Sequence, residues 1–139
     1  GSQAIVWTHN SHVNFLKGPT IMSRPMGGFL RKSIGDDYRT FGFVGYEGSY
    51  TAWKNGLQSF ELPKVHPGTL EYVLGQLDEP LFILDLKKMR ENNSPVSLWL
   101  DDLEFREIGS TPEIYYDAPV SEMFDYLIFI KDTSFSRTL

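Results

Sequence analysis

The sequence has no cysteine among its 139 residues. This absence excludes disulfide bonds, a thiolate nucleophile and cysteine-ligated zinc. Disulfides are rare in the cytosol, so a chain without cysteine fits a reducing compartment. We therefore predict a cytoplasmic protein.

An excess of positive charge and long apolar runs are also missing. Lys and Arg number 13 against 18 Asp and Glu, which gives a net charge of −5 and a pI of about 5.1. The densest basic cluster, Lys87, Lys88 and Arg90, is typical of the solvated face of a short helix. The longest apolar run, Tyr126–Ile130, is far shorter than the roughly 20 residues that cross a membrane. The sequence therefore predicts neither a nucleic-acid partner nor a membrane partner.

The length suits one domain, or one compact part of a larger domain. Hydrophobic residues make up 41% of the chain, which is enough to bury a core. The chain begins with Gly1-Ser2, which is typical of a cloning scar, and a strand pattern rather than a signal peptide follows. We therefore expect residues 3–139 to form a single unit taken from a longer protein.

The apolar pattern predicts helices that alternate with buried strands. Three apolar runs predict strands, namely Gln3–Thr8, Leu81–Leu86 and Phe124–Lys131. The first two are expected to be buried on both faces. Between them, Pro25–Ile34 and Leu70–Leu77 have helical spacing, and Gly35 suits the end of the first helix. This alternation predicts an α/β fold with a mixed sheet, buried central strands and helices on both faces, as part of a larger domain.

Shorter elements complete the pattern. Asn55-Gly56 is a strong two-residue turn signal, so Tyr50–Trp53 and Gln58–Leu62 are expected to pair as a hairpin. Tyr38–Tyr46 precedes them as a strand, whereas Leu98–Leu103 fits neither a helix nor a strand clearly. Two short strands are also expected, at Phe105–Ile108 and Ile114–Tyr116.

The segment with the most chemistry is His9-Asn10-Ser11-His12, directly after the first apolar run. Polar side chains at the carboxyl end of a buried strand are a common place for a site in α/β sheets. One imidazole can take a proton from water while the other orients or protonates a substrate carbonyl, and the Asn10 amide can fix a ring. Two alternatives stay open: polar loop residues without a catalytic role, or two ligands of a zinc ion that lacks an evident third ligand. The sequence predicts no cofactor.

Other polar candidates are weaker. Glu47 follows the Tyr38–Tyr46 strand and is a candidate to line the site, with a solvated carboxylate as the simpler interpretation. His66 precedes a Pro-Gly helix start and is interpreted as a turn or cap residue. Gly42–Gly48 is rich in glycine but lacks the Lys-Ser/Thr ending of a phosphate loop, so nucleotide binding is not expected.

Four segments together resemble one family. Val6–Val13 resembles a "W-x-H-N-x-H" segment, and Met26–Arg31 resembles an "M-G-x-x-L-R" helix. Gly35–Phe43 is similar to a "G-x-x-Y-x-x-x-G-F" strand, and Phe124–Phe129 to a closing "F-D-a-l-i-f" strand. In this order they resemble the C-terminal part of the erythromycin esterase and succinoglycan biosynthesis-type family.

The resemblance implies a water-mediated, histidine-assisted cleavage of a small ester or a macrolactone. His9 and His12 are then the expected catalytic residues, and Asn10 and Glu47 the expected substrate-binding residues. Family members carry a water-activating histidine–carboxylate pair and arginines upstream of this segment, and no such segment is present here. We therefore expect the isolated chain to be inactive, and the alternative is a non-enzymatic module of the same fold that binds a ligand or partner. We also expect self-association, or an apolar patch near His9 and His12.

Overall fold

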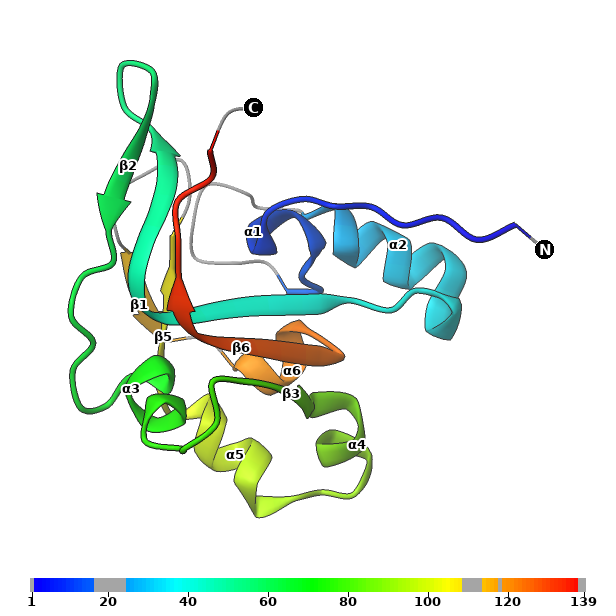
Figure 1. The fold of residues 1–139 in the computed structure, drawn as a ribbon. Coiled ribbons are helices and arrows are strands. Elements are labelled where there is room, and N and C mark those ends of the chain that lie inside the picture. The colour runs from blue at the N-terminus through cyan, green and yellow to red at the C-terminus, as the bar shows by residue number, and fades with distance from the viewer. Residues whose placement is uncertain (1, 17–24, 109–113, 118, 138–139) are drawn as a thin grey trace.

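The computed structural model describes residues 2–16, 25–108, 114–117 and 119–137 (Figure 1). Its helices are α1 (Asn10–Val13), α2 (Met26–Ile34), α3 (Leu70–Gly75), α4 (Leu86–Glu91), α5 (Pro95–Asp101) and α6 (Val120–Met123), with a 3₁₀ turn, η1 (Gly35–Asp37). Its strands are β1 (Phe41–Trp53), β2 (Leu57–Glu61), β3 (Leu81–Asp85), β4 (Glu104–Glu107), β5 (Ile114–Asp117) and β6 (Tyr126–Thr133). Among these described helices, none has the length and apolar character that a membrane crossing requires.

The main sheet has four strands in the order β2-β1-β6-β3. β1 and β6 are parallel, whereas β2 pairs with β1 and β3 pairs with β6 in the antiparallel sense. A parallel pair needs a long crossover, and the chain between β1 and β6 supplies α3 to α6. β4 and β5 form a separate antiparallel pair. The α/β fold with a mixed sheet is therefore confirmed.

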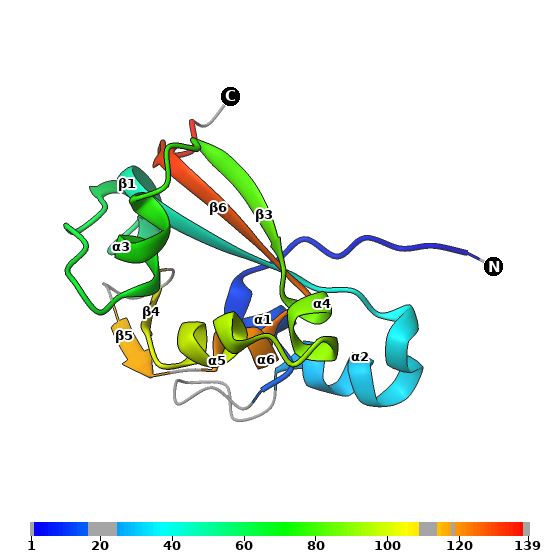
Figure 2. The same ribbon diagram turned by 90° about the horizontal axis from the view of Figure 1, so that it is seen from below.

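The hydrophobic core lies on one face of this sheet. Val44, Leu127 and Phe129 are buried on that face, with Phe82 and Leu84 packed against them. The helices supply the other side of the core, through Val13, Leu70, Leu74, Leu86, Leu100, Val120 and Met123. Figure 2 shows α3 to α6 together on one side of β1, β6 and β3.

Several local predictions are confirmed by these elements. α2 begins after Pro25 and ends at Gly35, whose φ of 56° favours glycine. The hairpin forms with Trp53 opposite Leu57, and Asn55 and Gly56 both have positive φ. The strand at Tyr38–Tyr46 and the first hairpin strand are parts of one element, β1.

The prediction of a buried strand at Gln3–Thr8 is wrong. This segment belongs to no helix or strand, and its apolar side chains face solvent, with Ile5 94% and Trp7 83% exposed. Figure 1 shows it as an extended segment leading away from α1 toward the N-terminus. An apolar run joins a sheet only where a neighbouring strand pairs with it, and among the described strands none pairs with residues 3–8.

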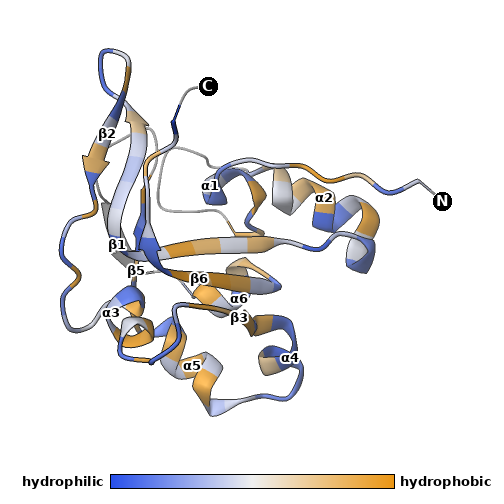
Figure 3. Cartoon of the chain, in the orientation of Figure 1, coloured by the Kyte–Doolittle hydropathy of each residue, from blue (hydrophilic) through white to orange (hydrophobic). Residues whose placement is uncertain are grey.

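Two other expectations are corrected. β3 is an edge strand that is buried on one face only, because Leu81 and Ile83 are 61% and 58% exposed. The ambiguous Leu98–Leu103 segment is mostly helical: α5 begins after Ser94, whose side chain caps it, and has a proline in its first turn. Figure 3 shows apolar residues along β6, and this colouring does not reveal which face of the strand is covered.

Candidate functional site

The His9–His12 segment forms a short helix instead of the predicted loop at the end of a buried strand. His9 caps α1, and its Nδ1 accepts a hydrogen bond from the Ser11 backbone N–H at 3.2 Å. The chain approaches α1 as an exposed extended segment, since residues 3–8 do not enter the sheet. The position of the two histidines is therefore set by contacts of α1 itself.

Asn10 attaches α1 to the sheet. Its Oδ1 accepts from the Phe43 N–H at 3.0 Å, and its Nδ2 donates to the Phe43 carbonyl at 2.7 Å. β6 pairs with this part of β1, and the Asn10 amide supplies a further partner for the Phe43 backbone. In this structure the Asn10 amide is engaged with backbone, and its substrate-binding role stays a prediction.

The His9 ring connects α1 to β4 across the molecule. Its Nε2 lies 2.5 Å from the carbonyl oxygen of Ile108, and its Nδ1 lies 2.8 Å from the Ser11 hydroxyl. Because Nδ1 accepts from the Ser11 backbone, the proton of the neutral ring belongs on Nε2, which donates to Ile108. Both ring nitrogens are therefore used within the chain.

Glu107 is a site residue that sequence reasoning missed. It ends β4, its side chain is 10% exposed, and its Oε1 lies 3.4 Å from His9 Nδ1. This contact joins the end of β4 to the start of α1. Because 98 positions separate the two residues in the chain, no local pattern could indicate the pairing.

His12 differs from His9. It lies in the last turn of α1 and is partly exposed. Among the described residues, no hydrogen bond or ion pair engages its imidazole. Its ring nitrogens can therefore donate to a ligand or accept from one.

The structure does not bring Glu47 and His66 to this segment. Glu47 is exposed on β1, four residues beyond Phe43, and stands opposite Asp132 of β6. His66 is exposed and 3.9 Å from Glu104, and its carbonyl accepts from the Thr69 hydroxyl at the start of α3. The interpretation of His66 as a turn residue is confirmed.

A buried carboxylate ties the other motif segments together. Asp125 is fully buried, with Arg31 at 2.6 Å and Arg90 at 3.4 Å. Its Oδ2 also accepts from the Thr40 N–H at 3.1 Å. Gly27, in the same helix as Arg31, packs closely against α1, since a Cβ on Gly27 would lie 1.9 Å from the Val13 carbonyl oxygen. The arginine of the M-G-x-x-L-R segment and the aspartate of the closing strand thus form one structural ion pair.

A second buried acid lies between α3 and β4. Burial raises the pKa of Glu71 to about 7, although its Oε1 accepts from the Arg106 N–H at 2.9 Å. The Arg106 guanidinium donates to the carbonyls of Gly45, Tyr46 and Pro63. These contacts join α3, β4 and β1, so this group is also interpreted as structural.

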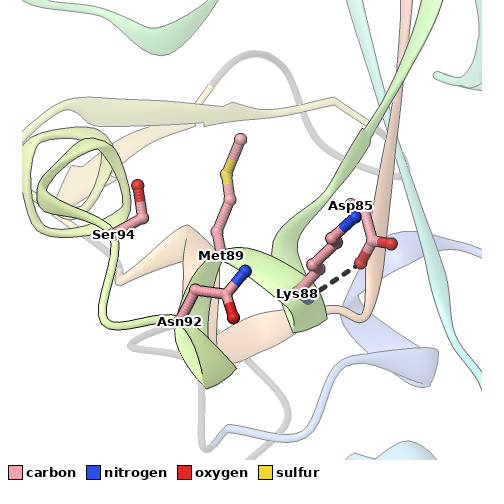
Figure 4. A pocket seen from close by; sticks show the side chains of 5 residues that line it. All are labelled: Asp85, Lys88, Met89, Asn92 and Ser94. Atoms are coloured by element: carbon pink, nitrogen blue, oxygen red, sulfur yellow. Dashed lines mark hydrogen bonds between the residues drawn. The ribbon is translucent and has the colours of Figure 1, made fainter.

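One open hollow of about 430 Å³ lies beside α4 (Figure 4). It is lined by Asp85, Lys88, Met89, Asn92 and Ser94, and does not include the His9–His12 segment. Asp85 is already used, because its carboxylate caps α4 at the Lys88 N–H. Within the part of the chain that the structure describes, no group of three His, Cys, Asp or Glu side chains could hold a metal ion.

Comparison with known proteins gives one family. The family model described as erythromycin esterase matches residues 1–133. No curated protein sequence matches the chain.

Three solved structures are similar. A succinoglycan biosynthesis protein is 26% identical with a TM-score of 0.76, over 92% of this chain and 32% of its own. A protein from Bacillus cereus is 24% identical with a TM-score of 0.70, over 91% of this chain and 32% of its own. A histidine-to-asparagine mutant of the erythromycin esterase EreC, in its open conformation, is 16% identical with a TM-score of 0.59, over 89% of this chain and 30% of its own. The last two likenesses concern the fold alone, and the chain spans about a third of the length of these proteins.

Proposed function

Because the chain belongs to the erythromycin esterase family, we propose that it carries a histidine-bearing part of an ester-hydrolase site. The proposed substrate is a small ester or a macrolactone. The observation that carries the proposal is the unengaged imidazole of His12, on a helix that Asn10 and His9 hold in place. A catalytic imidazole must be held in position, and its ring nitrogens must not already be hydrogen-bonded.

His12 is the catalytic residue in this proposal. When water attacks an ester carbonyl, negative charge develops on the carbonyl oxygen, and a positioned N–H stabilises it. His12 supplies that N–H, or donates its proton to the departing alkoxide. Loss of one such donor typically lowers the rate by about a hundredfold or more.

His9 serves as a positioning residue. Its ring is held at both nitrogens, by Ile108 on one side and by Ser11 on the other. Glu107 lies on the Nδ1 side of the same ring, with its Oε1 at 3.4 Å. The resemblance implies that the water-activating pair is supplied by another segment of the family fold.

Nuclear magnetic resonance of the histidine rings tests the proposal directly. The chain has three histidines, so each Cε1–H signal can be assigned with single variants. On addition of a macrocyclic lactone, or of a phosphonate that mimics the tetrahedral intermediate, the His12 signal should shift and the His66 signal should not. His12→Gln should weaken phosphonate binding by about tenfold, with His66→Gln as the matched control.

Turnover gives a second, separate measurement. Residues 1–139 alone should show no histidine-dependent hydrolysis of activated esters, because catalysis by water also needs a positioned base. Hydrolysis that is lost in His12→Gln would show that this chain suffices.

The alternative is a non-enzymatic module of the same fold that binds a ligand or a partner. The hydrogen bonds of His9 to Ile108 and of Asn10 to Phe43 favour this alternative, since both side chains then stabilise the fold. Phosphonate binding that is unchanged in His12→Gln, with no His12 signal shift, would support the module and reject the catalytic assignment.

A further inference from the structure

We propose that Asn55, in the turn between β1 and β2, is a self-modification site at which the side-chain amide is converted to a carboxylate. The attacking group is the backbone nitrogen of Gly56, and water completes the conversion. This inference is independent of the proposed function. It rests on the openness of the turn and on a hydrogen-bonding difference between Asn55 and the other asparagines of the chain.

The reaction needs no reagent other than water. The Gly56 nitrogen gives up its proton and bonds to the side-chain carbonyl carbon of Asn55, which closes a cyclic succinimide. The bond from that carbon to the amide nitrogen breaks, and ammonia leaves with the proton that Gly56 gave up. Water then opens the ring at either carbonyl, so position 55 becomes an aspartate or an isoaspartate. Asparagine is among the thermolabile residues of proteins for this kind of reason.

The β1–β2 turn gives the reaction room. Asn55 is exposed, and Trp53 and Leu57, which flank the turn, are each 66% exposed. Figure 1 shows the turn protruding from the rest of the molecule. A Cβ built on Gly56 would meet no heavy atom of the described residues within 4 Å, and glycine itself places no side chain beside the attacking nitrogen. The Asn55 carboxamide and the Gly56 nitrogen can therefore approach each other without a steric barrier.

The reacting groups are also not engaged in hydrogen bonds. The bond across the turn runs from the Lys54 N–H to the Gly56 carbonyl at 2.9 Å, so it uses the oxygen of Gly56 and not its nitrogen. Within the described part of the chain, neither the Gly56 N–H nor the Asn55 carboxamide makes a hydrogen bond. An amide nitrogen must lose its proton before it attacks, and an N–H that already donates within the fold resists that loss.

The other four asparagines lack a free nitrogen in the next residue. In each case the following N–H donates a hydrogen bond: Ser11 to His9 Nδ1 at 3.2 Å, Phe15 to the Met123 carbonyl at 3.0 Å, Asn93 to the Arg90 carbonyl at 3.0 Å and Ser94 to the Met89 carbonyl at 2.9 Å. The Asn10 carboxamide is held further by its two bonds to Phe43. The fold therefore protects these asparagines and leaves Asn55 reactive.

Asn93 provides the matched control. Like Asn55 it is exposed and has a positive φ, 49° against 56°. It differs in its follower, because Ser94 carries a side chain and its N–H donates to Met89. Ser94→Gly gives Asn93 the same follower as Asn55 and keeps the backbone bond to Met89. Ser94 also caps α5, and a glycine in place of a serine cap costs little stability. This variant therefore separates the effect of the dipeptide from the effect of the fold.

The product should alter the hairpin. An isoaspartate directs the main chain through the former side chain, which lengthens the turn by one carbon atom. Loop length sets the register of a hairpin, so the pairing of Trp53 with Leu57 should weaken. An aspartate leaves the main chain unchanged and adds only a negative charge beside Lys54.

Incubation of the 139-residue chain at mildly alkaline pH, followed by peptide mass spectrometry, tests the proposal. The peptide that contains Asn55 should gain the mass of an amide-to-acid exchange at least about tenfold faster than the peptide with Asn93, both in the parent chain and in Ser94→Gly. In urea the two asparagines of Ser94→Gly should react at similar rates, because the bond to Met89 is then lost. Asn55→Gln should remove the fast reaction.

Isoaspartate gives a second readout. A protein isoaspartyl methyltransferase with labelled S-adenosylmethionine should label the incubated parent chain and not Asn55→Gln, and amide exchange at Leu57 should accelerate in the labelled fraction. Circular dichroism verifies that both variants fold. Equal rates at Asn55 and Asn93 in folded Ser94→Gly would show that the dipeptide alone determines reactivity and would overturn the proposal. A faster reaction at any other asparagine, or no mass gain at Asn55, would overturn it as well.

Discussion

The region around Asp125 and the region around α1 are both built from segments that resemble the erythromycin esterase family, yet they use their polar groups differently. Asp125 is surrounded by Arg31, Arg90 and the Thr40 N–H, and it is fully buried. On α1, Asn10 and His9 are engaged within the chain while the His12 ring is not. Membership of a motif therefore does not show whether a side chain is engaged within the chain, whereas its hydrogen bonds and ion pairs do.

The largest effect is expected when the buried carboxylate of Asp125 is removed. Asp125→Ala leaves two arginines facing a buried space without their carboxylate, so the free energy of unfolding should fall by about 3–5 kcal/mol. Urea unfolding followed by circular dichroism measures this loss. The control is Asp36→Ala, because the Asp36 side chain is 76% exposed although it also pairs with Arg31; its effect should stay within about 0.5 kcal/mol. Similar losses in both variants would show that the buried carboxylate of Asp125 contributes no more to stability than the exposed one of Asp36.

Glu71 provides a buried acid without a matched ion pair, and removing its charge should stabilise the fold. Burial raises its pKa from 4.5 to about 7, so the folded chain binds the proton more tightly than the unfolded chain. Stability from this group is complete below about pH 4.5 and is lost as the pH rises to about 7. Glu71→Gln removes the ionisation, so it should add about 3 kcal/mol at pH 8 and little at pH 4.5.

Thermal unfolding across this pH range measures the Glu71 effect. Arg106, which donates its backbone N–H to Glu71, and His66 both favour the ionised form, and both remain in the variant. Glu61→Gln, at an exposed position on β2, should give no pH-dependent change. A stabilisation that is the same at both pH values would contradict the burial argument.

Local elements could be predicted from the sequence, and long-range contacts could not. The end of α2 at Gly35 and the hairpin at Asn55-Gly56 depend on backbone preferences of a few residues, and both were predicted. The Arg31–Asp125 pair joins residues 94 positions apart, and the apolar pattern around Asp125 indicates a strand without indicating its partner. The same reason explains the error at Gln3–Thr8: an apolar run shows that a segment can be buried, but the neighbouring strand determines whether it is.

The candidate site was predicted in outline only. His9-Asn10-Ser11-His12 was recognised from its residues, whereas its helical form and the different roles of its histidines required the structure. Glu107 carried no signal, because a glutamate in a short strand is ordinarily solvated. Its contact with His9 joins β4 to α1, two segments that are far apart in the chain.

A smaller loss of stability is expected when the hydrogen bonds between α1 and the sheet are removed. Asn10→Ala removes two hydrogen bonds to Phe43 and leaves that backbone without its side-chain partner, so the free energy of unfolding should fall by about 1–2 kcal/mol. Amide exchange at Phe43 should accelerate at the same time. Asn92→Ala, at an exposed position after α4, is the control and should change neither quantity. An unchanged exchange rate at Phe43 would show that Asn10 does not hold α1 to β1.

The smallest effect on stability is expected at His12, and it gives the sharpest comparison with His9. His9→Gln removes the α1 cap and the contact with Ile108, so it should cost about 1 kcal/mol. His12→Gln removes a ring that no hydrogen bond or ion pair of the described residues engages, so it should change the free energy of unfolding by less than about 0.5 kcal/mol. Denaturant unfolding of the two variants, measured side by side, gives both values. A residue that contributes nothing to stability yet is required for phosphonate binding has a role in the site rather than in the fold. Equal destabilisation by both variants would place His12 among the structural residues of α1, and the non-enzymatic alternative would then be favoured.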